Sequence, residues 1–230
     1  AGDARMRRSN PAMRWWPAAD GRLLPRTVGQ DVAEGTADVP LMLGHVANEA
    51  SVLVASFGKR PMMYAGMTPA VLGRDALALF RAHPPWRPAG AWRGLERLFT
   101  ALIFHEPAWE MACQLASLGR PPFVYHFDRI APARRDPRVL ASHASEVPYV
   151  FGNLPTDGCD ERDAALSAAM QAAWVAFATT GDPRSEGGAA WPRFDPAQGI
   201  VMRFGDRVAP GAHPRGPVFE ALRRRRSATA

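Results

Sequence analysis

Three short apolar runs mark the expected strands. The segment 39–44 (VPLMLG) is bounded by Pro40 and Gly44, which is typical of a buried strand. The segment 122–130 (PFVYHFDRI) alternates and is rich in aromatic and β-branched residues, and the segment 200–204 (IVMRF) is a third short apolar run. These segments predict three strands joined by long connections.

Between the strands, apolar residues recur at helical spacing. Thr68 or Pro69 begins a predicted helix that runs through Phe80. A second helical period extends over residues 95–118, and Pro107 interrupts it. Because proline removes a backbone donor and clashes with the preceding turn, we expect Pro107 to split or kink this helix.

A third helix is predicted after the second strand. Asp157 or Asp160 can cap its first N–H groups, and the run Gly-Asp-Pro at 181–183 ends it. The stretch 164–181 has no charged residue, but it is mostly alanine with interspersed Ser, Gln and Thr, so we expect a soluble helix and no membrane span. The apolar stripe of this helix consists of Leu166, Met170, Trp174 and Phe177.

Helices that separate strands indicate an α/β fold with a mostly parallel sheet and flanking helices. In such a sheet, functional residues gather in the loops that follow the carboxyl ends of the strands. Glu49 lies in the loop GHVANEAS after the first strand, and His143 and Glu146 lie in the loop SHASEVPYVFG that comes after the second. A carboxylate and an imidazole at successive strand ends are what a hydrolase needs to orient a base.

Composition excludes several classes of protein. With 47% hydrophobic residues among 230, the chain can form a real core and is not disordered as a whole. The net charge of +6 comes from the ends, because residues 1–30 carry six Arg and two Asp, and residues 201–230 carry seven Arg, one Asp and one Glu. The body between them is net acidic, so we expect no nucleic-acid partner.

The cysteines do not indicate a scaffold or a metal site. Cys113 and Cys159 are too few for a disulfide framework, although one bridge between them stays open. Neither Cys-x-x-Cys nor His-x-x-x-His spacing occurs, so no zinc site is predicted.

Five segments carry a more specific signal. The segment 143–153 (HASEVPYVFGN) resembles the catalytic-histidine motif of the type B carboxylesterases, the family that includes the cholinesterases. Four further segments resemble motifs of that family in the same order: WWPAADGRLLP (15–25), VPLMLGHVANEAS (39–51), PPFVYHFDR (121–129), and WVAFATTGDP (174–183) with WPRFD (191–195).

The resemblance implies roles for particular residues. Glu49 matches the acid that orients the catalytic imidazole, and His143 matches the general base. Asn48 stands where the family more often has Asp, which leaves the carboxylate itself in place. Glu146 is interpreted as structural, holding the histidine loop, and His45 is interpreted as structural as well. His126, inside the second predicted strand, is likewise interpreted as structural. The family hydrolyses carboxylic esters and implies no metal and no cofactor.

One part of the family pattern is absent. The 230 residues contain no Gly-x-Ser-x-Gly nucleophile elbow and no Gly-rich oxyanion loop, both of which lie upstream in the family. The chain therefore resembles the C-terminal half of an α/β-hydrolase of this family. The expected organisation is a basic segment at 1–14, the esterase half at 15–205 and a tail rich in Pro, Gly and Arg at 206–230.

Three hypotheses for the function follow. The chain is part of a serine ester hydrolase whose other half carries the serine, or it is a separately encoded half that binds an N-terminal half, or it is a non-catalytic cholinesterase-like interaction protein. Retention of both Glu49 and His143 argues against the third. Alone, the chain is predicted to be inactive. The sequence identifies neither the ester substrate nor the cellular compartment.

Overall fold

The computed structural model describes residues 19–35, 39–57, 61–132, 140–184 and 186–228. Contacts divide the chain into two units, Ala1–Asp38 and Val39–Ala230, and each is described by itself. In the first unit, helix α2 (Val28–Ala33) begins at Thr27, whose side chain forms a reciprocal capping box with Gln30. A turn lies at Asp20-Gly21, where the Asp20 side chain accepts backbone hydrogen bonds from residues 22–24.

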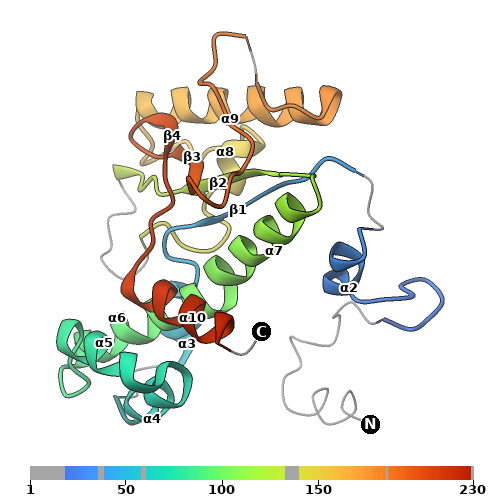
Figure 1. The fold of residues 1–230 in the computed structure, drawn as a ribbon. Coiled ribbons are helices and arrows are strands. Elements are labelled where there is room, and N and C mark those ends of the chain that lie inside the picture. The colour runs from blue at the N-terminus through green and yellow to red at the C-terminus, as the bar shows by residue number, and fades with distance from the viewer. Residues whose placement is uncertain (1–18, 36–38, 58–60, 133–139, 185, 229–230) are drawn as a thin grey trace. The chain divides into compact units, whose positions relative to one another are not determined.

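The second unit contains a four-stranded sheet (Figure 1). Its strands are β1 (Met42–Val46), β2 (Phe123–Phe127), β3 (Ile200–Phe204) and β4 (Val208–Ala212), in that spatial order. The first three are parallel and β4 is antiparallel to β3. The prediction of a mostly parallel α/β sheet is confirmed. β3 has its predicted bounds, whereas β1 begins three residues later than predicted and β2 is shorter at both ends.

Helices precede, separate and follow the strands. Between β1 and β2 lie α3 (Ser51–Phe57), α4 (Pro61–Leu72), the 3₁₀ turn η2 (Gly73–Asp75), α5 (Ala76–Ala82), α6 (Pro88–Phe99), the π-helical segment η3 (Thr100–His105) and α7 (Glu106–Ser117). Between β2 and β3 lie α8 (Val147–Val150) and α9 (Glu161–Thr180), and α10 (Pro217–Ser227) follows β4.

The predicted helix from Thr68 to Phe80 is wrong in its bounds. α4 begins seven residues earlier, at Pro61, and ends at Leu72, and α5 is a separate helix. Gly73 has a φ of 57°, which is left-handed backbone that glycine adopts at little cost, and this residue breaks the helix.

The helical period over residues 95–118 is interrupted where expected. Pro107 lies in the first turn of α7, directly after the π-helical segment η3. The preceding π-helical turn, η3, joins α6 to α7 and ends at His105. This wider turn directs His105 toward the sheet, where its ring contacts the carbonyl of Val46.

The predicted third helix is α9. Asp160 caps its first turn through hydrogen bonds from the backbone N–H groups of Arg162 and Asp163, and left-handed Gly181 ends it. By contrast, β4 and α10 were not predicted, because the segment 206–230 looks like a tail in the sequence. In the structure α10 buries an apolar side consisting of Val218, Phe219, Ala221 and Leu222.

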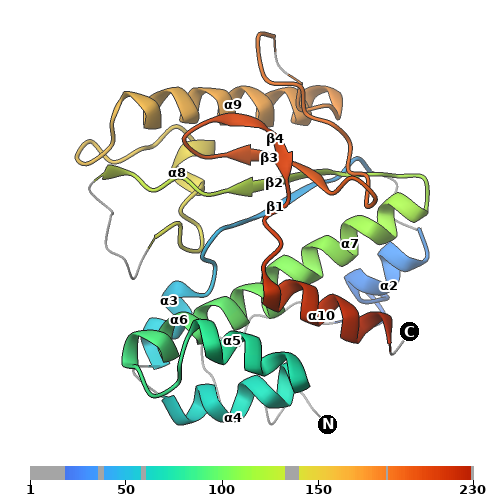
Figure 2. The same ribbon diagram turned by 60° about the vertical axis from the view of Figure 1, so that its left-hand side comes forward.

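Side chains from alternate strand positions form two cores on opposite faces of the sheet. Val46, Phe127 and Phe204 are register partners and pack in one core with α8 and α9. Val124 and Val201 point to the other face and pack in a second core with helices α3–α7 and α10. Figure 2 shows α9 on one side of the sheet and α7 on the other.

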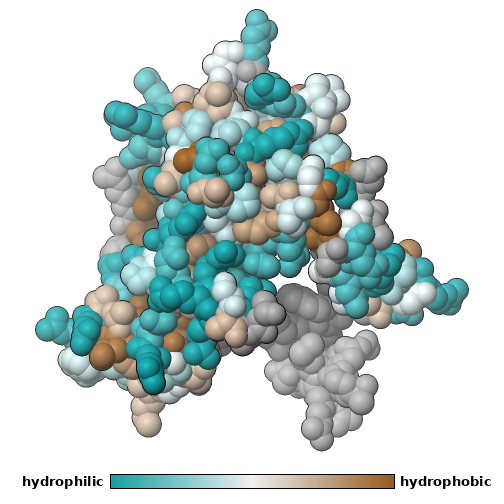
Figure 3. Space-filling view, in the orientation of Figure 1, coloured by the Kyte–Doolittle hydropathy of each residue, from teal (hydrophilic) through white to brown (hydrophobic). Residues whose placement is uncertain are grey.

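None of the described helices is both long enough and apolar enough to cross a membrane. The space-filling view in Figure 3 shows hydrophobic surface among hydrophilic residues at the lower left, over α4–α6. Met62, Leu77 and Trp86 are among the exposed apolar side chains of this region. Cys113 and Cys159, both described, are not joined by a disulfide.

Candidate active site

Glu49 and His143 lie together, although 94 residues separate them in the sequence. Oε2 of Glu49 is 2.6 Å from Nδ1 of His143, which is a hydrogen-bonding distance. Glu49 follows the end of β1, and His143 lies in the long connection after β2.

The backbone brings the two loops into register. Beyond the end of β1, Asn48 forms an isolated parallel bridge with Ser142, and its N–H donates to the carbonyl of Ala141 at 2.9 Å. Because Glu49 follows Asn48 and His143 follows Ser142, this bridge places the two side chains next to each other.

Glu49 is held on both carboxylate oxygens. It is buried, and Oε1 accepts a 2.9 Å hydrogen bond from the backbone N–H of Val46 while Oε2 faces His143. A buried carboxylate needs such partners, because its desolvation is costly without them. The acid therefore has one position, set by the strand that precedes it.

His143 lies at the tip of a tight turn. Ser145 N–H donates to the carbonyl of Ser142, and Ala144 between them has a left-handed φ of 63°. The side chain of His143 is 61% exposed. Since a carboxylate only accepts, Nδ1 must carry the proton in the contact with Glu49, and Nε2 is the basic nitrogen of the neutral ring.

Helix α6 and η3 support the turn that carries Glu49. The hydroxyl of Thr100 accepts from the backbone N–H of Ala50 at 3.0 Å and donates to Oε1 of Glu96 at 3.0 Å. Asn48 also donates to Oε1 of Glu96, at 3.2 Å. Burial raises the pKa of Glu96, and the hydrogen bonds from Asn48 and Thr100 oppose this rise.

Glu146 lies near the pair but outside it. Its backbone carbonyl accepts hydrogen bonds from the first turn of α8. Burial raises the pKa of its carboxyl group, and Oε2 has no hydrogen-bond partner among the described residues. The prediction that this side chain holds the histidine loop stays a prediction.

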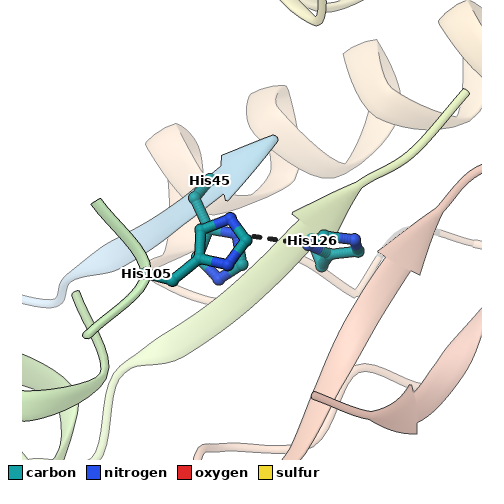
Figure 4. A group of neighbouring side chains, drawn as sticks. All are labelled: His45, His105 and His126. Carbon is teal, nitrogen blue, oxygen red and sulfur yellow. Dashed lines mark hydrogen bonds between the residues drawn. The ribbon is translucent and has the colours of Figure 1, made fainter. Parts of the chain in front are cut away.

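Four buried histidines form a second polar cluster, which we call the histidine cluster: His45 on β1, His105 at the end of η3, His126 on β2 and His213 after β4. His45 contacts two of the others, with Nδ1 3.1 Å from Nδ1 of His126 and Nε2 2.8 Å from Nε2 of His213. Its ring also stacks on that of His105, with centroids 3.8 Å apart (Figure 4).

Burial keeps these rings neutral. It lowers the pKa of His105 to about 4 and, with help from neighbouring imidazoles, those of His126 and His213 to about 3. The pKa of His45 lies well below its ordinary range for the same reasons, burial first. Four adjacent imidazoles could not all be charged without strong repulsion.

Sequence reasoning did not find the histidine cluster. The sequence assigns His45 and His126 separate structural roles and gives no signal for His105 or His213. The available signal was positional: His45 and His126 are register partners on neighbouring strands, so their side chains share one face of the sheet.

Comparison with solved structures defines the class of fold. A structure titled PNB esterase matches 91% of this chain and 44% of its own, with a TM-score of 0.70 and 26% identity. A carboxylesterase of Geobacillus stearothermophilus gives a TM-score of 0.73 at 23% identity over 94% of this chain and 47% of its own. The unit is thus part of an α/β-hydrolase fold.

The family follows from the sequence comparison. The model of the carboxylesterase family matches residues 78–217, more than half of the chain. This protein belongs to the carboxylesterase family.

Curated relatives agree with this assignment. Fumonisin B1 esterase of Sphingopyxis macrogoltabida is 31% identical over 85% of this chain and 38% of its own length. Para-nitrobenzyl esterase of Bacillus subtilis is 30% identical over 77% of this chain and 37% of its own. The chain therefore spans about two fifths of the length of these relatives.

Proposed function

We propose that this chain supplies the acid and the general base of a Ser-Glu-His triad in a carboxylic ester hydrolase. Glu49 is the acid, His143 is the base, and the serine and oxyanion hole come from polypeptide outside these 230 residues. The observation that carries the proposal is the 2.6 Å contact between Oε2 of Glu49 and Nδ1 of His143.

The geometry suits the two roles. With Nδ1 donating to Glu49, Nε2 of His143 can take the proton of an attacking serine hydroxyl and later give it to the leaving alcohol. The buried carboxylate then stabilises the imidazolium that forms in between. A positioned general base accelerates such reactions by roughly 10² to 10⁴.

The sheet leaves a place for the polypeptide that carries the serine. β1 is the first strand in the spatial order, and no described strand pairs with its other edge. A further parallel strand added there would end beside the loop of Glu49, where a nucleophile elbow belongs. The absence of Gly-x-Ser-x-Gly from these 230 residues is consistent with that arrangement.

The class of substrate is inferred from the relatives. Fumonisin B1 esterase and para-nitrobenzyl esterase both act, by their names, on esters. We therefore assign carboxylic esters as the substrate class.

A chimeric protein tests the proposal. The part of Bacillus subtilis para-nitrobenzyl esterase that this chain does not match would be joined to residues 39–230, and hydrolysis of p-nitrophenyl acetate would be measured. We expect turnover in the chimera and none from the chain alone. His143→Ala should lower kcat by roughly 10⁴-fold or more, and Glu49→Gln by about 10⁴-fold, because the imidazole loses its tautomer and orientation.

Matched controls separate chemistry from folding. His83→Ala and Glu161→Gln change a histidine and a glutamate outside the site and should leave kcat within about twofold. A folded chimera without turnover would contradict the catalytic assignment and favour the non-catalytic interaction protein. Labelling of one of this chain's own serines by an organophosphonate probe would show that the nucleophile is internal.

A further inference from the structure

The histidine cluster shares no residue with the proposed triad. It consists of imidazoles alone, and no side chain is more than 8% exposed. Three of its members come from elements that are distant in sequence, with His45 on β1, His126 on β2 and His105 at the end of η3 (Figure 4). One nitrogen of each of these three rings lies within 4.8 Å of those of the other two.

Hydrogen bonding determines which nitrogen His105 presents. Its Nε2 is 2.9 Å from the carbonyl oxygen of Val46. A carbonyl only accepts, so Nε2 carries the proton, and Nδ1 of the neutral ring keeps its lone pair. A histidine that donates one N–H to a backbone carbonyl and presents the other nitrogen is the usual arrangement of a metal ligand.

Each ring nitrogen of His45 faces a nitrogen of another imidazole. Nδ1 faces Nδ1 of His126, and Nε2 faces Nε2 of His213. A neutral imidazole carries one N–H. With that proton on Nε2 and donated to His213, Nδ1 presents a lone pair toward His126, and this is the nitrogen that would bind a cation.

We propose that His45, His105 and His126 bind one divalent transition-metal ion through their Nδ1 atoms. Zinc–nitrogen bonds of about 2.0–2.1 Å in a tetrahedral site place the ligand nitrogens about 3.4 Å apart. His45 and His126 are already at 3.1 Å. The ligand nitrogens of the widest pair lie within 4.8 Å of each other, so this pair must close by up to about 1.4 Å when the ion binds.

Two of the three opposite nitrogens have hydrogen-bonding partners. Nε2 of His105 donates to Val46, and Nε2 of His45 contacts His213. Nε2 of His126 points toward Asp128, whose Oδ2 lies 4.0 Å away. Such outer contacts fix the tautomer and orientation of ligating histidines.

The donor set selects the class of metal. Three neutral imidazoles suit Zn²⁺, Co²⁺, Ni²⁺ and Cu²⁺, whereas Mg²⁺ and Ca²⁺ require oxygen ligands. A cavity of about 470 Å³ is lined in part by His105 and His126, so an ion can approach these two rings from it.

Val46 connects this site to Glu49. Its carbonyl accepts from His105, and its N–H donates to Oε1 of Glu49. A metal ion that tightens His105 against β1 would therefore stabilise the strand end from which Glu49 projects. We infer a structural role for the ion, tying η3 to the sheet.

Titration of the chelator-treated chain with Zn²⁺ by calorimetry tests this site. We expect one Zn²⁺ per chain with a Kd of about 1 µM or lower, and a higher Tm in its presence. His126→Asn and His105→Gln, checked for folding by circular dichroism, should weaken binding about 100-fold or more. His143→Ala removes the exposed histidine and should leave stoichiometry and Kd unchanged.

Spectroscopy of the unmutated chain gives an answer that does not depend on how the variants fold. Co²⁺ should produce the visible absorption of a four-coordinate ion with imidazole ligands. A folded chain that binds neither Zn²⁺ nor Co²⁺ would overturn the proposal. So would binding that survives in His126→Asn and disappears in His143→Ala, which would identify adventitious binding at the exposed imidazole.

Discussion

At the scale of single residues, the site depends on groups that determine where a proton lies. Glu49 accepts from Val46 and from His143, so its position and the tautomer of the imidazole are set together. Thr100 likewise bonds two groups at once, next to the residue that follows Glu49. Its hydroxyl satisfies the N–H of Ala50 and a carboxylate oxygen of Glu96 at the same time.

Substitution of Thr100 tests this support. Thr100→Val keeps the shape of the side chain but leaves the buried N–H of Ala50 without its acceptor and removes a donor from Glu96. We expect the free energy of unfolding to fall by about 1–3 kcal/mol, measured by urea denaturation. Thr100→Ser retains the hydroxyl and should recover most of that loss. Equal stability of the Val and Ser variants would contradict the role of the hydroxyl.

At the scale of elements, the parallel strands pack closely because small and large residues face each other. Gly44 on β1 is the register partner of Tyr125 on β2, and a Cβ atom at Gly44 would overlap the tyrosine ring. The glycine is needed for this close approach, since its φ is not in the left-handed region. Tyr125 thereby lies across β1 and reaches Trp174 of α9.

Gly44→Ala should therefore destabilise the sheet. Overpacking of this kind costs typically about 1–3 kcal/mol, which would appear as a lower midpoint of urea denaturation. Gly66→Ala is the matched control, because a Cβ there meets nothing within 4 Å and α4 gains helix propensity. That variant should be more stable by about 0.5–1 kcal/mol. A neutral Gly44→Ala would show that Tyr125 moves aside freely.

At the scale of the whole second unit, a buried ion-pair network joins the sheet to α9. The guanidinium of Arg129, after β2, bonds both oxygens of Asp163 and also reaches Asp160 and Asp206. Tyr149 donates to Asp163 at 2.6 Å. Burial by itself raises the pKa of Asp163, but the hydrogen bonds from Arg129 and Tyr149 outweigh it and hold that pKa well below its usual range.

The network predicts a loss of stability in acid. A carboxyl whose folded pKa lies below its unfolded value of about 3.9 contributes stability that is present above about pH 4 and lost as the pH falls toward the folded pKa. Asp163→Asn should lower the free energy of unfolding at pH 7 by about 3–5 kcal/mol, because it leaves the buried Arg129 short of a partner. It should also make the free energy of unfolding depend less on pH below about pH 4.

Asp206→Asn is the control for this prediction. Asp206 bonds the same guanidinium, but its side chain is 76% exposed. Its loss should cost less than about 1 kcal/mol, since water replaces the interaction. If Asp163→Asn and Asp206→Asn lost equal stability, burial of Asp163 would not be the reason for the loss in Asp163→Asn.

Local signals in the sequence determined the parts of this protein that depend on neighbouring residues. Apolar runs located three strands to within a few residues, Asp160 and Gly181 marked the ends of α9, and the motifs around Glu49 and His143 identified the pair that the structure brings to 2.6 Å. Capping, turns and motif spacing act over a few residues, so a sequence shows them directly.

Tertiary structure alone decided the features that depend on distant residues meeting. His45 contacts His213 across 168 positions, and α10 packs its apolar side on a core formed by residues far from it in the sequence. Strand register and the packing of elements determine such contacts, and the spacing of residues along the chain shows neither of them. The histidine cluster therefore exists only because the fold brings β1, β2 and η3 together.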